Sequence, residues 1–580
     1  MTIYAGSDSN IVGGTTAADR NVFGGNTGYG VNISGTGGST LNVVQGNYIG
    51  LTASGAMAAP NAGGIQISGG ATNNTIGGIG AGASNRIGGN TTYGVVANGT
   101  GTIGNAVQFN DFGTLPNSTG ALQITSSASV YAGGTFAGAV SNNGTFDIFG
   151  NGASIVGAFT GTGEVTNGEV AGTAILTLNG TGAFTGSIHN GSGANVGLTV
   201  AGGTVTLGGT NTYTGATTVS GGALNLGGSL ASNVTVGATG TLGGTGTVTG
   251  TITNSGVVAP GNSTGIFTIN GNYSQDSTAT LNIELAGISA NSPIQFDQLI
   301  VNGTVSLAGA LNSTLFGGFT PSVGNSFKII DNDLADAVSG TFTGLGQNST
   351  FLLGGYPFQI NYSGGTGNDV VLTVLGKSWV GGATGDWNTT SNWAGNSLPG
   401  STEYAIVPSG VTVTHSSGTH TVAGITGVGN LTVSGCTLNA IGSTSGSALL
   451  GAVAVNALNN FVSSTLNFST GAGVTLASLA LSSLAVGTQA TLGGSDTVTV
   501  TGTTSTNTSG ASQGGSITMT GSGRTIAQGV LTLGAQNGAV NLSAGRILEN
   551  AGTATFNTSE SPISLSGGAS IINDLGATWK

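Results

Sequence analysis

Charged side chains are scarce in this sequence. Lys and Arg together number 7 and Asp and Glu 19, which is 4% of the 580 residues and leaves a formal net charge of −12. Nucleic-acid binding depends on clustered basic side chains that contact phosphates, so the composition argues against a nucleic-acid partner. Disordered chains combine high charge with low hydrophobicity, whereas here 38% of the residues are hydrophobic. We therefore expect an ordered protein.

Proline and cysteine are nearly absent as well. The 9 prolines, together with 113 glycines that do not recur at every third position, exclude collagen. The single cysteine, Cys436, excludes an intramolecular disulfide, and its flanking residues predict a small buried side chain rather than a reactive thiol. Long apolar runs are also missing, so we expect no transmembrane helix in this chain.

The two ends of the sequence lack other signals. The N-terminal MTIYAGSDSN has neither the basic nor the apolar region of a signal peptide. The C-terminal INDLGATWK does not resemble the end of a folded module. From these features we expect the chain to be a fragment of a longer protein, and the export route is not identified.

The sequence does contain a repeat made of short strand patterns and turn residues. Residues 10–37 align with residues 74–101 at a constant offset of 64, which makes Tyr29 and Tyr93 equivalent. We interpret the offset as three coils of about 21 residues in a parallel β-helix. The two tyrosines should then lie about 14 Å apart along one axis. Glycine supplies the corners with positive φ, and corner asparagines should stack as amide ladders.

A second repeat begins near Leu176. TLNGTGAFTG and TLGGTNTYTG share the frame T-L-x-G-T-x-x-[FY]-T-G, and GTNTYTGATTVSGGALNL, LGGTGTVTG, GVVAPGNSTGIFTINGNY and LNIEL belong to the same region. This region, roughly residues 177–285, resembles the autotransporter-associated β-strand repeat of bacterial autotransporters and related large surface proteins. The resemblance implies a right-handed β-helix that passes through an outer-membrane barrel, the translocator of the full-length protein.

Later segments resemble other parts of large bacterial surface proteins. The longer strand patterns of residues 286–375 resemble a cap-like unit, and the region around Trp379 resembles a unit that opens a new β-helix. The last part resembles the haemagglutination-type repeats of filamentous haemagglutinin-like adhesins.

The predicted fold class is all-β, with right-handed parallel β-helix (solenoid) sections joined by small β cap-like modules. At about 4.8 Å per coil, the helical residues would form a rod on the order of 100 Å long. The predicted parts are an N-terminal parallel β-helix with the 64-residue repeat (1–112), a β-helix of autotransporter-associated repeats (113–285), a cap-like β module (286–375), a Trp-rich β unit opening the second helix (376–442) and a haemagglutinin-like β-helix (443–580).

Candidate metal ligands are few. Asp331, Asp333 and Asp336 follow the strand pattern FKII, and such acids in a loop either ligate Ca²⁺ or form a solvated turn. Asp369 lies in GGTGNDVVL, which matches a Ca²⁺-binding nonapeptide, although a single copy lacks the stacked neighbour that completes the ion's shell. The alternative there is a glycine turn before the strand VVLTVL. We expect no bound metal and no cofactor.

Three of the four tryptophans, Trp379, Trp387 and Trp393, fall within fifteen residues. Such a group either caps the edge of a core or stacks on sugars. Both interpretations stay open from the sequence.

A carbohydrate-active enzyme, pectate-lyase-like or a glycoside hydrolase acting on polysaccharide, is the alternative function, because such enzymes also use β-helices and grouped carboxylates. The three histidines have no Cys or acidic neighbours at metal-ligand spacing, so we expect no catalytic or metal role for them. The charged residues of the N-terminal helix are Asp8, Asp19, Arg20, Arg86 and Asp111.

We therefore expect a non-catalytic structural or adhesive protein. Its β-helical, passenger-type stalk would display a polar uncharged surface, secreted or on the exterior of the bacterial outer membrane. The expected partners are host or environmental glycans or surfaces.

Overall fold

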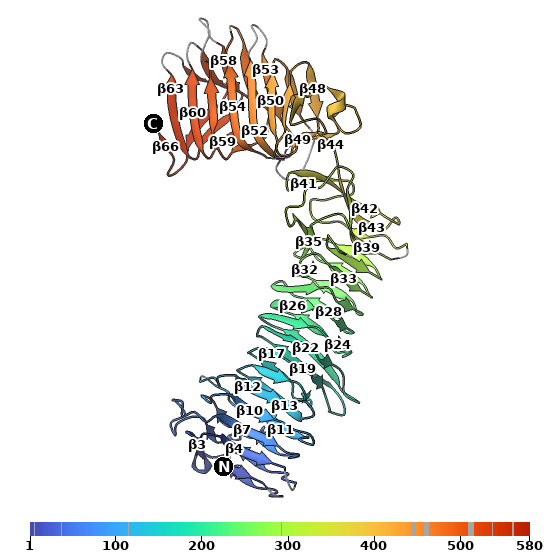
Figure 1. Cartoon of the computed structure of the whole chain (residues 1–580), viewed down its shortest axis with the longest axis vertical. Coiled ribbons are helices and arrows are strands. Elements are labelled where there is room, and N and C mark those ends of the chain that lie inside the picture. Colours follow the sequence, from blue (N-terminus) through green and yellow to red (C-terminus); the bar gives the residue numbers. More distant parts are fainter. Residues whose placement is uncertain are drawn as a thin grey trace.

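The chain forms an elongated molecule of stacked β-coils, with the N- and C-termini at opposite ends (Figure 1). The computed structural model describes residues 1–4, 6–35, 38–113, 115–291, 293–333, 335–441, 448–457, 463–471, 473–485, 487–508, 515–535, 538–558 and 562–580. Within these residues the regular elements are strands and two short 3-10 helices, η1 (Ala17–Asp19) and η2 (Thr390–Asn392). The predicted all-β solenoid is confirmed.

Strands one coil apart pair in parallel, which builds long sheets along the solenoid. β4 (Tyr29–Ser34), β7 (Gly63–Ser68) and β10 (Tyr93–Ala97) form one such series. Along β35 (Thr280–Leu285) half-buried and buried positions alternate. Because successive side chains of a strand point to opposite faces, the inward aliphatic residues of stacked coils form a continuous core within each solenoid.

Three parallel series of strands run along the first solenoid. The β13–β40 sheet contains β13 (Ser129–Phe136), β16 (Ala153–Ile155), β19 (Thr173–Leu178), β22 (Asn195–Val200), β25 (Thr217–Val219), β28 (Val234–Val236), β31 (Ile252–Asn254), β34 (Tyr273–Gln275), β37 (Val305–Leu307) and β40 (Ser339–Gly340). The β20–β38 sheet contains β20 (Gly182–Phe184), β23 (Thr204–Leu207), β26 (Gly222–Leu226), β29 (Gly240–Gly244), β32 (Val257–Pro260), β35 and β38 (Ala310–Leu315). The β24–β39 series contains β24 (Thr210–Asn211), β27 (Ser229–Leu230), β30 (Thr247–Val248), β33 (Ile266–Ile269), β36 (Gln298–Val301) and β39 (Ser326–Asn332).

Corner asparagines form the predicted amide ladders. Asn10 Nδ2 donates to Asn42 Oδ1 at 2.8 Å, and Asn42 Nδ2 donates to Asn74 Oδ1 at 2.9 Å, with a step of 32 residues each time. Asn74 continues the ladder to Asn105 at 2.9 Å. Two parallel ladders contain Asn21, Asn47, Asn85 and Asn110, and Asn26, Asn61, Asn90 and Asn117.

The 64-residue repeat is real, but the predicted coil number is wrong. Two ladder steps of 32 residues make up the repeat, so it contains two coils rather than three. The coils are long because their corners carry extra residues. Residues 51–58, for example, form a small loop closed by an antiparallel bridge between Leu51 and Ala58. Tyr29 and Tyr93 lie in register on one sheet with Gly63 between them, which places them about 10 Å apart. A Cβ atom at Gly63 would overlap with the ring of Tyr29.

Coils become shorter at about residue 120, where Leu122 pairs with Val140 and Val140 with Phe159. The T-L-x-G-T-x-x-[FY]-T-G frame does not match their register. Asn233 and Thr251, one coil apart, are separated by 18 residues. Phe184 of the first copy of the frame pairs with Leu207 in the β20–β38 sheet. Tyr213 of the second copy instead follows β24, in another sheet. The two copies of the frame therefore occupy different positions around the coil.

Parallel stacking continues to β39 and β40, and an antiparallel unit follows. β39 pairs antiparallel with β43 (Asp369–Val374), β43 with β42 (Tyr356–Gly364), and β42 with β41 (Thr350–Leu353). One hydrophobic core runs from Ile3 to Val374, and a separate core begins at Trp379. The antiparallel strands therefore close the first core.

The second solenoid repeats the parallel arrangement, as the upper part of Figure 1 shows. One series contains β45 (Thr384–Asp386), β47 (Thr412–His415), β50 (Asn430–Ser434), β52 (Ala448–Ala457), β54 (Val474–Ser483), β57 (Thr504–Asn507), β60 (Val530–Ala535), β63 (Thr553–Thr558) and β66 (Thr578–Trp579). A second series contains β48 (Thr419–Val422), β51 (Thr437–Ala440), β53 (Ser464–Phe468), β55 (Gln489–Gly493), β58 (Ser516–Met519), β61 (Ala539–Leu542) and β64 (Ile563–Leu565).

Candidate functional sites

One group of ionisable side chains lies at the beginning of the second solenoid. His415 ends β47, His420 lies in β48, and Cys436 directly precedes β51. His415 Nδ1 is 2.6 Å from Cys436 Sγ, and His415 Nε2 is 2.7 Å from His420 Nδ1. The Cys436 thiol donates to the carbonyl oxygen of His415 at 2.9 Å. The three side chains thus form a chain of contacts centred on His415.

The contacts define where the protons lie. Because the thiol proton points to a carbonyl oxygen, Cys436 Sγ accepts from His415 Nδ1–H, and His415 Nε2 accepts from His420 Nδ1–H. Burial, followed by the neighbouring His420, lowers the pKa of His415 to about 4. Burial raises the pKa of Cys436 to about 11. Near neutral pH His415 and Cys436 are therefore both uncharged, and the group lacks the thiolate that nucleophilic attack or metal binding requires.

The tryptophans enclose this group rather than offering a ligand surface. Trp379, Trp387 and Trp393 are 4%, 0% and 0% exposed. Trp393 meets Trp379 and Trp387 edge to face, with ring centroids 5.2 and 4.8 Å away, and His415 packs on Trp387 at 5.6 Å. A sugar stacks only on an open aromatic face. The glycan-stacking interpretation is therefore not supported by this burial, whereas the core-edge interpretation fits it.

Two of the predicted Ca²⁺ candidates meet at a lysine. Lys328 Nζ lies 2.6 Å from Asp331 Oδ1 and 3.7 Å from Asp369 Oδ2. The buried Asp369 carboxylate also accepts the backbone N–H groups of Asn332 at 2.9 Å and Thr366 at 3.1 Å. The ammonium group of Lys328 supplies the positive charge between these carboxylates.

The other two candidates contribute backbone oxygens. Asp333 and Asp336 accept hydrogen bonds through their carbonyls from the side chains of Asn368 and Asn332, at 2.6 and 2.8 Å. Among the described residues, no three His, Cys, Asp or Glu side chains are placed to hold one metal ion. The predicted absence of bound Ca²⁺ stays a prediction.

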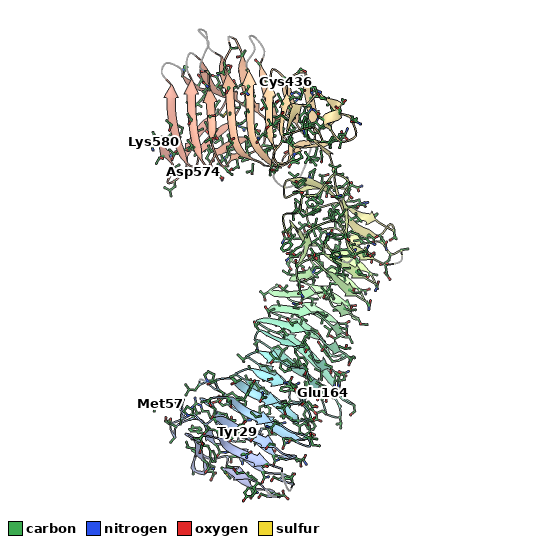
Figure 2. The ribbon with its side chains drawn as sticks, in the orientation of Figure 1. Tyr29, Met57, Glu164, Cys436, Asp574 and Lys580 are labelled. Atoms are coloured by element: carbon green, nitrogen blue, oxygen red, sulfur yellow. The ribbon has the colours of Figure 1, made fainter. Side chains whose placement is uncertain are left out.

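A groove of about 360 Å³ on the first solenoid contains one carboxylate, that of Glu164. Glu164 Oε1 accepts the Thr145 hydroxyl at 2.5 Å, and its Oε2 lies 3.3 Å from His189 Nε2. The hydrogen bond from Thr145 is the main reason that the pKa of Glu164 is lowered. Figure 2 shows Glu164 on the first solenoid, far from Cys436 on the second.

Asp147, two residues after Thr145 on β15 (Thr145–Asp147), is a structural carboxylate. Its Oδ1 accepts the backbone N–H groups of Phe149 at 2.9 Å and of Gly168 at 2.8 Å, and the residue is 7% exposed. Burial raises the pKa of Asp147. Asp147 binds the backbone of two successive corners and does not line the groove, so Glu164 is the only carboxylate among the described residues that line it.

Asp297 is a second buried carboxylate that holds backbone in place. Its Oδ1 accepts the N–H of Gly265 and its Oδ2 the N–H of Glu284, both at 2.8 Å. Burial, with a smaller contribution from the charge of Glu284, raises the pKa of Asp297 to about 7. This clamp ties the loop before β33 to β35.

Sequence reasoning missed these groups because their members are one coil apart. Cys436 and His415 are 21 residues apart, and Glu164 and His189 are 25. The histidines therefore do have Cys and acidic neighbours, but not at the short spacings of metal-binding motifs. A search for ionisable pairs separated by one coil length is the signal that would have found them.

No protein-family model matches the chain, and no curated protein matches it at a significant level. No helix in the described residues has the length and apolar character needed to span a membrane.

Proposed function

We propose that this chain is a non-catalytic structural or adhesive stalk of a bacterial surface or secreted protein. The long solenoid holds binding surfaces away from an anchoring point, and its outer face carries mostly small uncharged side chains. The similarity of residues 177–285 to autotransporter-associated repeats supports the same class of protein. Glycans or other surfaces of a host or of the environment are the proposed partners.

The observation that carries this proposal is the use of the basic side chains. Four of the seven, those of Arg86, Lys328, Lys377 and Arg524, form ion pairs with nearby carboxylates. Arg20 lies 4.1 Å from the ring centroid of Tyr48, and Arg546 is fully buried and donates to Thr525. These cations stabilise coils, so they are not free to act as acids or bases on a polymer.

One observation favours the carbohydrate-active enzyme as a second candidate. Glu164 lines an open groove with His189 3.3 Å from its carboxylate, and a carboxylate is the group that glycoside hydrolases use. Hydrolysis requires a partner carboxylate on the other side of the bond, and Asp147 is bonded to backbone instead. The stalk is therefore the better supported function.

A direct comparison of adhesion and turnover tests both candidates. Beads coated with the full chain should adhere to glycan-bearing or cell surfaces above the level of albumin-coated beads. The soluble chain should release no reducing ends and no unsaturated uronates from neutral or acidic polysaccharides. Turnover that Glu164→Gln abolishes and Glu169→Gln preserves would overturn the proposal in favour of the enzyme.

A further inference from the structure

One outward row of hydroxyl side chains runs the length of the β13–β40 sheet. Each member pairs in register with the next, one coil away. We call these residues the hydroxyl row: Thr135, Ser154, Thr177, Thr199, Thr218, Thr235, Thr253, Ser274, Ser306 and Ser339. At about 4.8 Å per coil, the row spans about 43 Å.

The hydroxyls of this row are free to meet a ligand. All ten residues are described, and each is exposed or half-buried, whereas the flanking strand residues, such as Val234 and Val236, point into the core. The hydroxyl of Ser154 accepts a long bond of 3.5 Å from Asn179 Nδ2. The other nine side-chain hydroxyls have no partner within the described chain. The row therefore presents unused donors and acceptors at regular intervals.

The first members of the row line an open groove. Thr135, Ser154 and Thr177 lie in a hollow of about 430 Å³, where Gly152 and Ile175 form neighbouring wall positions. No ionisable side chain lines this groove among the described residues. Its lining of hydroxyl, amide, glycine and apolar groups suits an uncharged ligand with both polar and apolar edges.

Other outward rows of the same solenoid lack this continuity. In the β24–β39 series Thr210, Ser229, Thr247 and Thr268 are followed by Ile300. On the β20–β38 sheet one outward row contains Ala183, Thr206, Asn225, Gly243 and Ala259, and the other contains Thr204, Ala223, Thr241 and Val257. Ten successive hydroxyls therefore distinguish one face of the rod, which is expected of a binding surface rather than of general solubility.

We propose that the hydroxyl row binds a linear, uncharged polysaccharide that lies along the solenoid axis. Each Thr or Ser hydroxyl offers one donor and two acceptor positions, which matches the hydroxyl groups that recur on every sugar of such a chain. A polyanion is disfavoured because the row contains no cation and the chain carries a net charge of −12. This inference specifies the ligand and the face for the adhesive function proposed above, and rests on that function.

The geometry implies that binding strength depends on ligand length. A single hydroxyl contact contributes little net free energy, because it replaces hydrogen bonds to water. The free energies of successive contacts along one polymer add, because once the first sugar is bound, each further contact forms without a new loss of translational freedom. Long oligosaccharides should therefore compete for binding at concentrations at least about tenfold below those needed with the disaccharide.

The test measures retention of the full chain on insoluble cellulose, chitin, starch and β-1,3-glucan, with pectate as a charged comparison. In the row variant Thr218, Thr235 and Thr253 are replaced by Val, which removes the hydroxyls and keeps the β-branched shape. In the matched control Thr210, Thr247 and Thr268, on another face, are replaced by Val. Circular dichroism and thermal melting verify that both variants fold.

We expect affinity for at least one neutral polysaccharide to fall about tenfold or more in the row variant and to remain unchanged in the control. Four outcomes would overturn the inference: the row variant and the control lose affinity equally, neither loses affinity, the chain prefers pectate, or the disaccharide competes as well as long oligosaccharides. So would binding to ice alone, seen as arrested ice growth that the row variant loses. If coated beads adhere but no polysaccharide binds, the hydroxyl row is not the binding surface, and the proposed stalk function still stands. Glu164-dependent turnover would instead overturn the stalk function.

Discussion

At the scale of single residues, burial rather than neighbouring charge is the main cause of the shifted pKa values of Cys436, His415 and Asp297. Cys436 is 6% exposed, and its pKa is raised to about 11 chiefly because the apolar surroundings disfavour a thiolate. His415 is 0% exposed and stays neutral for the same reason. The contact between Cys436 and His415 is thus a structural hydrogen bond, although the same two residue types form catalytic pairs in more exposed sites.

We expect the native thiol to be inert. In the folded chain at pH 8, an aromatic disulfide reagent should modify Cys436 at least about a hundredfold more slowly than in the same chain unfolded in urea, because the thiolate fraction is small and access is blocked. Absorbance of the released thiolate measures the rate, with Cys436→Ala as the blank. Comparable rates in the two states would contradict this account.

Asp297 should make stability depend on pH. Its folded pKa of about 7 lies above the value near 3.9 of an unfolded Asp. The folded chain therefore holds the proton more tightly, and the free energy of unfolding falls as pH rises from about 4 to about 7, by up to about 4 kcal/mol from this residue. Urea unfolding at several pH values across this window measures the slope.

The variant Asp297→Asn separates this residue from the others that titrate in the same range. Its unfolding free energy should be lower overall, since one of the two N–H donors loses its acceptor, but its dependence on pH should be flatter than that of the natural chain. Parallel pH profiles for the two chains would disprove the assignment.

At the scale of structural elements, the asparagine ladders hold successive corners in register. Asn74 Oδ1 accepts both the backbone N–H and the side-chain amide of Asn42, at 3.0 and 2.9 Å. Asn74 also donates to Asn105 at 2.9 Å, and all three residues are 0% exposed. A break in the ladder leaves buried groups of both neighbours without partners, which is more costly than the loss of the bonds themselves.

We expect Asn74→Ala to lower the free energy of unfolding by about 3 kcal/mol or more. The matched control is Asn302→Ala, which removes an amide pair with Asn270 on the exposed surface and should cost no more than about 0.5 kcal/mol. Chemical denaturation of the three chains gives the comparison. Equal costs for the two variants would show that the ladders are not important for stability.

At the scale of the whole molecule, the chain contains two hydrophobic cores. The first ends at Val374, and the second begins with the tryptophan group at Trp379. Contacts between them include Leu352, which packs against the second core, and the hydrogen bond from the Thr426 hydroxyl to the carbonyl of Gly355. Each core should therefore unfold as its own unit.

Calorimetry should resolve two transitions. Trp387→Ala opens a large cavity in the second core and should reduce the stability of that core by about 3–5 kcal/mol, which shifts only its transition to lower temperature. Phe146→Ala should shift only the transition of the first core. A single transition that both variants shift would indicate one cooperative unit instead.

The sequence alone predicts the class of fold and some of its fine structure. Alternating short strands, glycine corners and asparagines at repeated positions are local patterns, so the β-solenoid, the presence of corner asparagine ladders and the equivalence of Tyr29 and Tyr93 can be derived without coordinates. The proposed stalk function also rests largely on composition and on the resemblance of the central repeat.

The tertiary structure decides which side chains meet across coils. The length of each coil depends on how its corner loops close, so the number of residues between two stacked side chains changes from coil to coil while the strands stay in register. For this reason the repeat of 64 residues contains two coils rather than three. The contact of Cys436 with His415, the bond of Glu164 to His189 and the hydroxyl row all depend on that register, which no local pattern encodes.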